Sequence, residues 1–174
     1  MKKQFSTRIL AQQGLFVAGL TICAWISIPF GDISFTLQTF ALYLALFTLG
    51  GKRGSVVFFV YLLMGAVGLP VFSGFRGGFG VLLGPTGGYL WGLAFAGPIY
   101  WLFTRMGGEK CALGAVVCAM VLCYLGGTLW FLYAYAGQSP WWTVALKCVA
   151  PYLLPDAAKI ALAYAVSRRL HKVI

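Results

Sequence analysis

Long uncharged runs are the feature that most constrains how this chain can fold. The first run, from Ile9 to Gly31, carries no charged side chain, and similar apolar runs follow it almost to the end of the sequence. Runs of this length are typical of helices that cross a bilayer, because about 20 apolar residues span its hydrocarbon core. A transmembrane barrel would need short strands of alternating polarity instead. The sequence therefore predicts an all-α integral membrane protein.

The overall composition agrees with contact between the chain and membrane lipid. Hydrophobic residues make up 61% of the sequence and charged residues only 9%, which is not typical of a soluble domain. The net charge of +10 could suggest a nucleic-acid partner. The basic residues, however, lie between the apolar runs and not in one stripe with exposed aromatic residues. We therefore expect one membrane domain over residues 1–174 and no nucleic-acid partner.

The basic residues also predict the orientation of the chain. If both termini are cytoplasmic, ten of the lysines and arginines fall on the cytoplasmic side, and only Arg76 and Lys147 lie near the outer side. Such an excess on one side is the positive-inside pattern of multi-pass membrane proteins. We expect six transmembrane helices with cytoplasmic N- and C-termini and a glycine-rich outer loop between the third and fourth. The expected helices cover residues 9–31, 36–50, 55–69, 85–104, 111–134 and 143–167, and the first outer loop is expected at residues 29–35, over the end of the first span.

The glycine-rich stretch, residues 68–92, is expected to form an outer loop that leads into the fourth helix. Gly84 suits the cap of that helix and Pro85 its first position, where the missing N–H costs nothing. Thr86 and Tyr89 lie beside a stripe of small residues and would fringe it with hydroxyl groups. In lipid, such a stripe lets another backbone approach closely. The stripe consists of Gly84, Gly88, Gly92 and Ala96.

Two ionisable residues, Asp156 and Lys159, lie in the last apolar segment. Asp156 is about 20 Å from the start of that segment along a helix, near the middle of the bilayer. An ionisable group at that depth costs roughly 2.5 to 3.5 kcal/mol. The three-residue spacing allows the two side chains to neutralise each other in a self-contained ion pair. Pro151 and Pro155 favour a functional site instead, because we expect them to break the helix just before Asp156.

Two further polar residues have two interpretations each. Gln38 lies near the outer end of the second helix, where it could contribute donors and acceptors to a binding site or simply cap the helix. Arg76 is on the outer side, against the charge pattern. It is either a tolerated residue that extends to the lipid headgroups or an anion anchor at the mouth of a pocket.

The sequence offers little for catalysis. Its five cysteines form no CxxC pair, and the single histidine, His171, lies in the basic tail. We therefore expect no catalytic residue, no metal site and no cofactor. The phosphate loop GxxxxGK[ST] is missing, so this chain should not hydrolyse ATP itself. An intramembrane enzyme would need a second acid or base beside Asp156, and a channel would repeat polar residues along its pore.

Four segments resemble the BioY family, the biotin-binding S-components of energy-coupling factor (ECF) transporters. They are Phe35-Thr-Leu-Gln-Thr39, Gly-Leu-Pro-Val-Phe-Ser-Gly at 68–74, Gly-Pro-Thr-Gly-Gly-Tyr-Leu-Trp-Gly at 84–92, and Pro151-Tyr-Leu-Leu-Pro-Asp-Ala-Ala-Lys159. The resemblance implies a subunit that captures biotin and lies in the bacterial cytoplasmic membrane. It also implies a coupling transmembrane subunit and ATPase subunits as partners. The alternative is an S-component for a different small vitamin.

The resemblance also implies a set of binding residues. Asp156 would accept hydrogen bonds from the ureido ring of biotin, and Lys159 or Arg76 would pair with its carboxylate; which cation does so stays open. In the first helix, Gly14 and Ala18 are a loose version of the small-residue pattern by which S-components dock on the coupling subunit, although packing inside the bundle explains them equally. The other expected substrate-binding residues are Gln38, Thr86, Gly88 and Tyr89.

Overall fold

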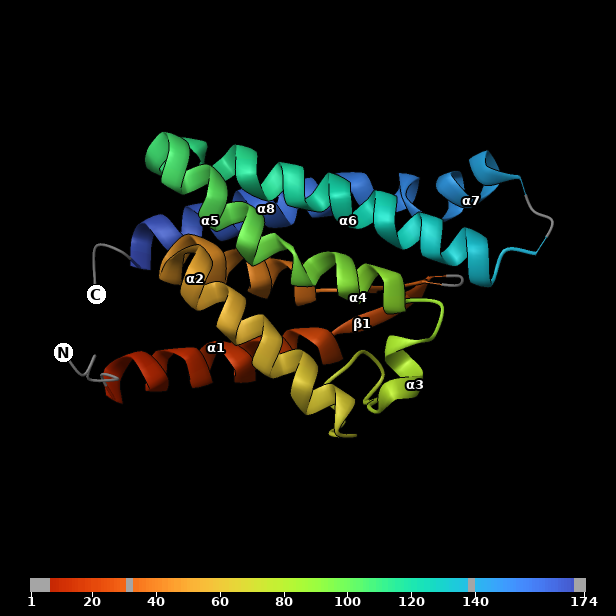
Figure 1. Cartoon of the computed structure of the whole chain (residues 1–174), viewed down its shortest axis with the longest axis horizontal. Coiled ribbons are helices and arrows are strands. Elements are labelled where there is room, and N and C mark those ends of the chain that lie inside the picture. Colours follow the sequence, from red (N-terminus) through yellow and green to blue (C-terminus); the bar gives the residue numbers. More distant parts are fainter. Residues whose placement is uncertain (1–6, 31–32, 138–139, 171–174) are drawn as a thin grey trace.

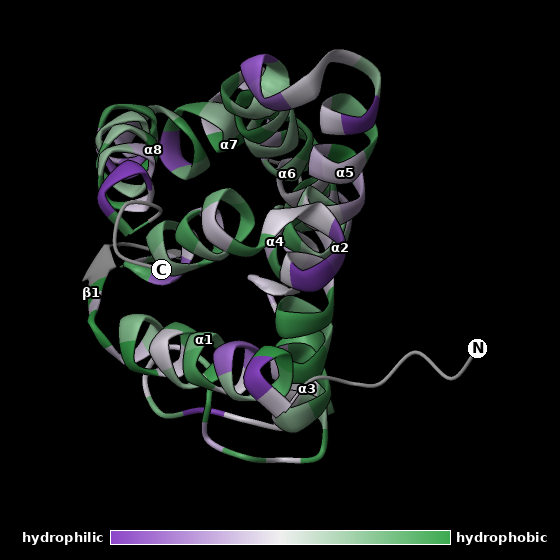
Figure 2. Cartoon of the chain, turned by 90° about the vertical axis from the view of Figure 1, so that its left-hand side faces the viewer, coloured by the Kyte–Doolittle hydropathy of each residue, from purple (hydrophilic) through white to green (hydrophobic). Residues whose placement is uncertain are grey.

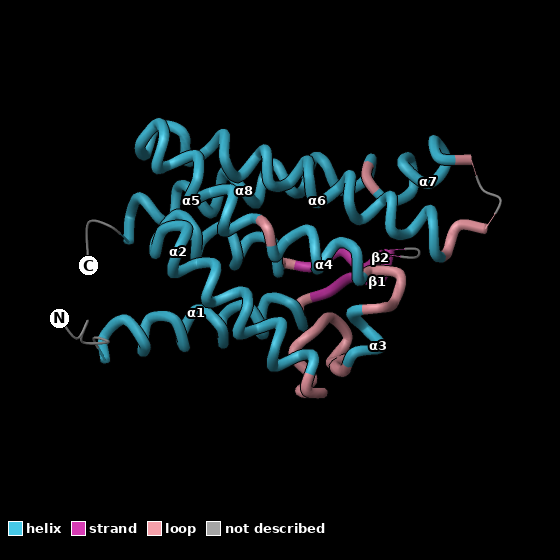
Figure 3. The backbone as a smooth tube through the Cα atoms, viewed as in Figure 1, coloured by secondary structure: helices cyan, strands magenta, loops and turns pink. Residues whose placement is uncertain are grey.

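The computed structural model describes residues 7–30, 33–137 and 140–170. Its helices lie side by side in an elongated bundle, with a short β-hairpin near one end (Figures 1 and 3). The elements are α1 (Thr7–Trp25), β1 (Ser27–Phe30), β2 (Ile33–Thr36), α2 (Gln38–Ala66), α3 (Phe79–Leu82), α4 (Gly87–Ala94), α5 (Ala96–Gly107), the 3₁₀ turn η1 (Gly108–Cys111), α6 (Ala112–Ala134), α7 (Trp141–Cys148) and α8 (Ala150–Leu170).

The helices have the length and composition of membrane-spanning segments. Four helical stretches in the described part of the chain are long and apolar enough to cross a bilayer: Thr7–Trp25, Gln38–Ala66, Gly87–Ala134 and Trp141–Leu170. Large apolar side chains cover much of the outer surface, and apolar ribbon dominates the helices in Figure 2. This arrangement suits lipid outside the bundle, and it confirms a helical, membrane-type architecture.

The chain reverses direction within α2. Gly50 has φ 78° and ψ 168°, which no helix contains. A Cβ built on Gly54 would lie 3.4 Å from the Cα of Leu46, whereas residues eight apart in a continuous helix are separated by about 12 Å. The two halves of α2 are therefore antiparallel neighbours joined by a tight turn. They correspond to the second and third of the expected helices.

The first helix is shorter than expected. We expected it to use the uncharged span up to Gly31, with a loop at residues 29–35, but α1 ends at Trp25 and the strands that follow form an antiparallel hairpin (Figure 3). Ser27 pairs with Thr36, and Phe30 pairs with Ile33. The strands are rich in aromatic and β-branched residues, which favour extended structure. The expected helical end was therefore wrong, and the hairpin forms part of the site described below.

The start of the fourth expected helix also differs. Gly84 and Pro85 were expected at its cap and first position, but α4 begins at Gly87 with Thr86 as the preceding residue. A short helix, α3, comes before this point and ends at Leu82. From Gly87 the chain stays helical through α4 and α5, which meet at Phe95.

The small-residue stripe packs as expected, against α6. A Cβ added at Gly88 would collide with Trp130, and one at Gly92 would lie 2.8 Å from the Cα of Cys123. Any larger side chain at either position would push α4 and α6 apart. The glycines thus allow the two backbones to approach closely.

The last apolar segment breaks earlier than expected. The interruption lies at Val149, between α7 and α8, and not just before Asp156. Pro151 falls in the first turn of α8, where a proline is tolerated. Pro155 lies inside α8, which continues through it. Its missing N–H would otherwise bond the carbonyl of Pro151, so the cost is one backbone hydrogen bond.

The loop after α2 is fastened to the bundle. The hydroxyl of Tyr61 donates to the carbonyl of Val71 at 2.9 Å, and the N–H of Gly78 donates to the carbonyl of Gly65 at 2.7 Å. The ring of Phe72 lies so close to Gly65 that a Cβ there would collide with it. These contacts hold Phe72 inside the bundle, beside the cavity described next.

Candidate binding site

A cavity of about 110 Å³ lies among the first half of α2, the hairpin, α4, α6 and α8. A single water needs about 10 to 15 Å³ by the same kind of measure, so the space suits a small organic molecule. Phe72 and Ser73 of the loop after α2 also line it. Most of its walls are aromatic or aliphatic, and the polar groups gather around Asp156. This combination is typical of small-molecule binding sites.

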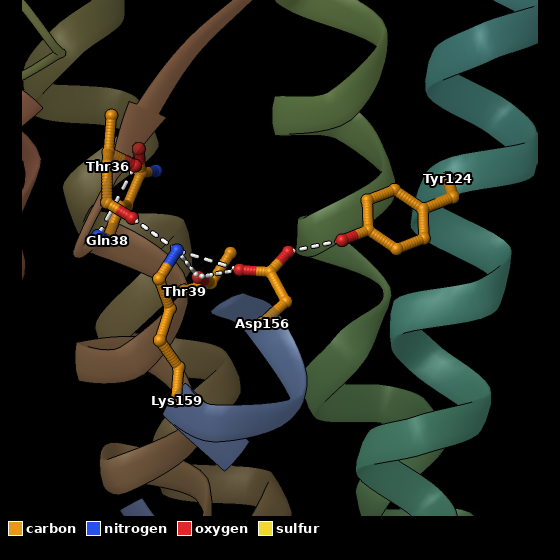
Figure 4. A network of polar contacts seen from close by, with 6 residues as sticks. All are labelled: Thr36, Gln38, Thr39, Tyr124, Asp156 and Lys159. Carbon is orange, nitrogen blue, oxygen red and sulfur yellow. Dashed lines mark hydrogen bonds and ion pairs between the residues drawn. The ribbon is translucent and has the colours of Figure 1, made fainter. Parts of the chain in front are cut away.

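Asp156 and Lys159 form an ion pair on one face of α8, as their spacing predicts (Figure 4). The Nζ of Lys159 lies 2.7 Å from Oδ1 of Asp156. Asp156 is 6% exposed and Lys159 is 7% exposed. Both side chains line the cavity. The pair is therefore a buried one, and its charges depend on surrounding protein groups for solvation.

The ammonium group of Lys159 has acceptors for all three of its N–H donors. Besides Asp156, it donates to the carbonyl oxygen of Thr36 at 2.6 Å and to Oγ1 of Thr39 at 3.2 Å. The ring of Phe35 faces it, with its centroid 3.9 Å from Nζ. An ammonium has three N–H groups and no acceptor. In this arrangement Lys159 thus joins α8 to the hairpin and to α2.

The carboxylate of Asp156 is less fully occupied. Oδ1 accepts from Lys159 and from the Thr39 hydroxyl, the latter at 3.3 Å. Oδ2 accepts from the hydroxyl of Tyr124 on α6, so that Asp156 lies between Lys159 and Tyr124 (Figure 4). A carboxylate offers about four acceptor positions. One position on Oδ2 is therefore left for a further donor at the cavity.

Gln38 contributes the complementary group. It is 6% exposed and lines the same cavity. Its Nε2 has no hydrogen-bond partner among the described residues. Leaving such a buried donor unpaired costs roughly 1 to 3 kcal/mol, and a ligand acceptor would remove that cost. The cavity thus presents an acceptor at Asp156 and a donor at Gln38.

Two more of the expected residues lie at this cavity. Thr86 lines it, and so does Tyr89, whose hydroxyl lies 3.2 Å from Oγ1 of Thr128. The structure therefore brings five of the expected substrate-binding residues together. The five are Gln38, Thr86, Tyr89, Asp156 and Lys159.

Gly88 and Arg76 lie outside this cavity. Gly88 faces Trp130 and lines a separate groove between α4 and α6. Arg76 lies in the loop after α2, where its Nε donates to the carbonyl of Ser73 at 3.2 Å. Because Ser73 itself lines the cavity, Arg76 is a near neighbour of the site and not part of its wall.

Thr39 and Tyr124 both bond to Asp156, and neither was expected from the sequence to belong to the site. Thr39 follows Gln38 directly and belongs to the quoted segment 35–39, so its hydroxyl offered a signal. Tyr124 lies in an uncharged apolar run, and its partner is 32 positions away. A periodic pattern within one helix does not reveal that contact.

Gly14 and Ala18 line a different surface, an apolar groove between α1 and the second half of α2. Thr21 on α1 and Val56 and Val60 on α2 also line it. A Cβ added at Gly14 would meet no atom within 4 Å. Close packing inside this chain therefore does not require the glycine.

The fold and the site together are those of a helical membrane-type protein with a small, partly polar cavity, an arrangement that suits a small-molecule-binding protein. The fold matches the crystal structure of the S-component for biotin from an ECF-type ABC transporter, with a TM-score of 0.86. That match covers 99% of this chain and 95% of the other, at 23% sequence identity.

Sequence comparisons give the family. The BioY family model matches residues 1–174. Similar proteins include the probable biotin transporter BioY of Pyrococcus horikoshii, 36% identical over 90% of this chain and 91% of the relative, and the biotin transporter BioY of Rhodobacter capsulatus, 32% identical over 90% of each. The biotin transporter BioY of Thermotoga maritima is 52% identical, but over only 49% of this chain and 50% of the relative. The chain belongs to the BioY family.

Proposed function

We propose that this protein captures biotin on the outer side of the membrane and serves as the substrate-binding S-component of an ECF transporter. Family membership supports the proposal, and relatives aligned over nine-tenths of the chain are named as biotin transporters. The observation that carries it is the buried Asp156–Lys159 pair at a small cavity with mostly apolar walls. The protein would act as a transporter subunit and not as an enzyme.

The polar groups of the cavity complement the ureido ring of biotin. That ring has two N–H donors and one carbonyl. In the proposed complex, Oδ2 of Asp156 accepts from an N–H group, and Nε2 of Gln38 donates to the carbonyl. The rings of Phe35 and Tyr152 stack with centroids 6.5 Å apart, and Tyr89 lies at the same cavity. These rings offer apolar walls to the bicyclic body of biotin.

The hydrogen bonds of Lys159 bear on which cation meets the carboxylate. All three N–H groups of Lys159 have protein acceptors. Among the described residues, Arg76 uses one of its five N–H donors, on the carbonyl of Ser73. We therefore propose that the valerate chain extends toward Arg76 and that Lys159 holds Asp156 in place. Gly88 would contribute indirectly, by letting α4 pack on α6.

The proposed topology has six transmembrane helices with both termini cytoplasmic. The two halves of α2 supply the second and third, α4 with α5 the fourth, α6 the fifth, and α7 with α8 the sixth. The glycine-rich loop is then on the outer side. The protein would lie in the bacterial cytoplasmic membrane with ECF coupling and ATPase subunits as partners. The groove lined by Gly14 and Ala18 is the proposed docking surface for the coupling subunit.

Equilibrium binding of biotin to the purified, detergent-solubilised chain tests this function. A ring-altered analogue and an unrelated vitamin are the controls. Tight binding that depends on an intact ureido ring is expected. If a well-folded sample does not bind biotin, the substrate is a different small vitamin and the biotin assignment is wrong.

A further inference from the structure

A second polar cavity lies further along α8, about three turns beyond Asp156. It has a volume of about 230 Å³ and lies between the first half of α2, α5, η1 and the end of α8. In the view of Figure 1 this is the end of the bundle where α8 ends. The cavity belongs to neither the biotin site nor the groove along α1. Its position at the basic ends of α5 and α8 places it near one membrane surface.

Tyr100 lines this cavity from α5. Tyr100 is 6% exposed, and its ring packs edge-on against Phe47 with centroids 5.9 Å apart. Tyr164 packs against Phe47 in the same way, at 5.4 Å. Within the described part of the chain, the Tyr100 hydroxyl has no hydrogen-bond partner. Unlike Nε2 of Gln38, this hydroxyl is accessible, so it can donate to an acceptor that enters the cavity.

Charges of both signs line the same cavity. Lys110 and Arg168 supply two cations, and Glu109 supplies a carboxylate. Among the described residues, none of these three makes a salt bridge within 4.0 Å. The guanidinium of Arg168 lies 6.0 Å from the centroid of the Tyr164 ring, at the edge of the cavity. The cluster therefore fits a ligand that carries an anionic group and a cationic group together.

We propose that this cavity binds the headgroup of an aminophospholipid such as phosphatidylethanolamine. Lys110, Arg168 and the Tyr100 hydroxyl bind the phosphate, whose oxygens accept hydrogen bonds and pair with cations. Glu109 binds the ammonium group. The proposed topology puts this end of the bundle at the cytoplasmic surface, where phospholipid headgroups are the most abundant phosphates. The site lies apart from the biotin cavity and does not depend on the biotin assignment.

The test uses native mass spectrometry on the purified, delipidated full chain in detergent. Phosphatidylethanolamine, phosphatidylglycerol and phosphatidylcholine with identical acyl chains are added in turn. We expect phosphatidylethanolamine to bind at least about tenfold more tightly than the other two. Arg168→Gln should remove about tenfold of that affinity. The matched control is Arg169→Gln, because Arg169 is exposed and does not line the cavity.

Two more measurements identify the groups that bind the headgroup. Glu109→Gln should shift the preference from phosphatidylethanolamine toward phosphatidylglycerol, because the partner of the amine is lost while both cations remain. Tyr100→Phe keeps the ring and should weaken binding of every lipid that carries a phosphate. Biotin binding is measured on each variant and should not change, which shows that the variants are folded.

Several results would overturn the proposal. Equal binding of the three lipids would show that the cavity does not recognise a headgroup. Equal effects of Arg168→Gln and Arg169→Gln would show that only overall charge matters. A third arm uses soluble phosphoethanolamine, which has the same chemistry without acyl chains. If it binds as tightly as the lipid, the site belongs to the free compound and the lipid assignment is wrong.

Discussion

Replacing Asp156 by asparagine separates the role of this residue in binding from its role in folding. The carboxylate accepts from Lys159 and Thr39 through Oδ1 and from Tyr124 through Oδ2. An asparagine can turn its oxygen toward Lys159 and its amide toward the oxygen of Tyr124, which also accepts. The shape of the site is then retained. What is lost is the negative charge and the last acceptor position for a ligand.

The substitution should lower both the stability of the protein and its affinity for biotin, by different amounts. Removing one partner of a buried ion pair costs about 3 to 5 kcal/mol in the free energy of unfolding. We expect about 3 kcal/mol here, at the lower end, because the ammonium of Lys159 keeps the Thr36 carbonyl and the Thr39 hydroxyl as acceptors. A hydrogen bond to a charged group contributes about 1.5 to 3 kcal/mol, so biotin affinity should fall about 10- to 100-fold.

Thermal unfolding in detergent measures the stability, and isothermal titration with biotin measures the affinity. The double variant Asp156→Asn with Lys159→Met distinguishes the two effects. It removes the unpaired charge, so most of the stability should return. Biotin affinity should stay low, because the acceptor is still missing. If affinity returns together with stability, or if Asp156→Asn binds biotin like the original protein, Asp156 is not a binding residue.

Two further substitutions test the surroundings of the site. Tyr124→Phe removes the donor to Oδ2 of Asp156 and should weaken biotin binding about tenfold; an unchanged titration curve would show that Tyr124 does not position the carboxylate. Gly88→Ala places a methyl group against Trp130 and should cost about 1 to 3 kcal/mol of stability in thermal unfolding. The control is Gly126→Ala, where the new methyl meets nothing within 4 Å. Equal melting temperatures for the two alanine variants would refute the close packing of α4 on α6.

The sequence predicts the helical, membrane-type architecture because long apolar runs leave few alternatives in lipid. It did not lead us to the hairpin, although residues 33–36 alternate apolar and polar side chains after Gly31-Asp32, a recognised two-residue turn signal. Because these residues lie at the end of a long apolar run, we expected a helix followed by a loop there and not paired strands. The two turn residues, 31–32, lie outside the described part of the chain.

The proline positions show a second limit of sequence reasoning. Pro155 was expected to break the last helix, yet α8 continues through it and the interruption falls at Val149. One lost backbone bond is a cost that packing against neighbouring helices can offset. Which of several nearby residues ends a helix therefore depends on tertiary contacts, and a single sequence does not contain them.

The polar site, too, could be predicted from the sequence only in part. The Asp156–Lys159 pair could be predicted because both residues lie on one helix, three positions apart. Their other partners, Thr39 and Tyr124, come from α2 and α6 and are 117 and 32 positions from Asp156. Such contacts depend on how helices are arranged around the cavity. The sequence therefore indicated the centre of the site but not the residues that hold it in place.

The hydrogen bonds around Asp156 and Lys159 support a role for this pair in binding. A buried ion pair is seldom more stabilising than apolar residues of similar size, so stability alone does not account for charges at this depth. Lys159 has acceptors on all its N–H groups, which fixes the orientation of Asp156. Beside it, an acceptor position on Asp156 and the unpaired amide of Gln38 lie at the same cavity. The ion pair thus holds Asp156 in place beside the amide of Gln38, so that a ligand in the cavity could pair with both groups.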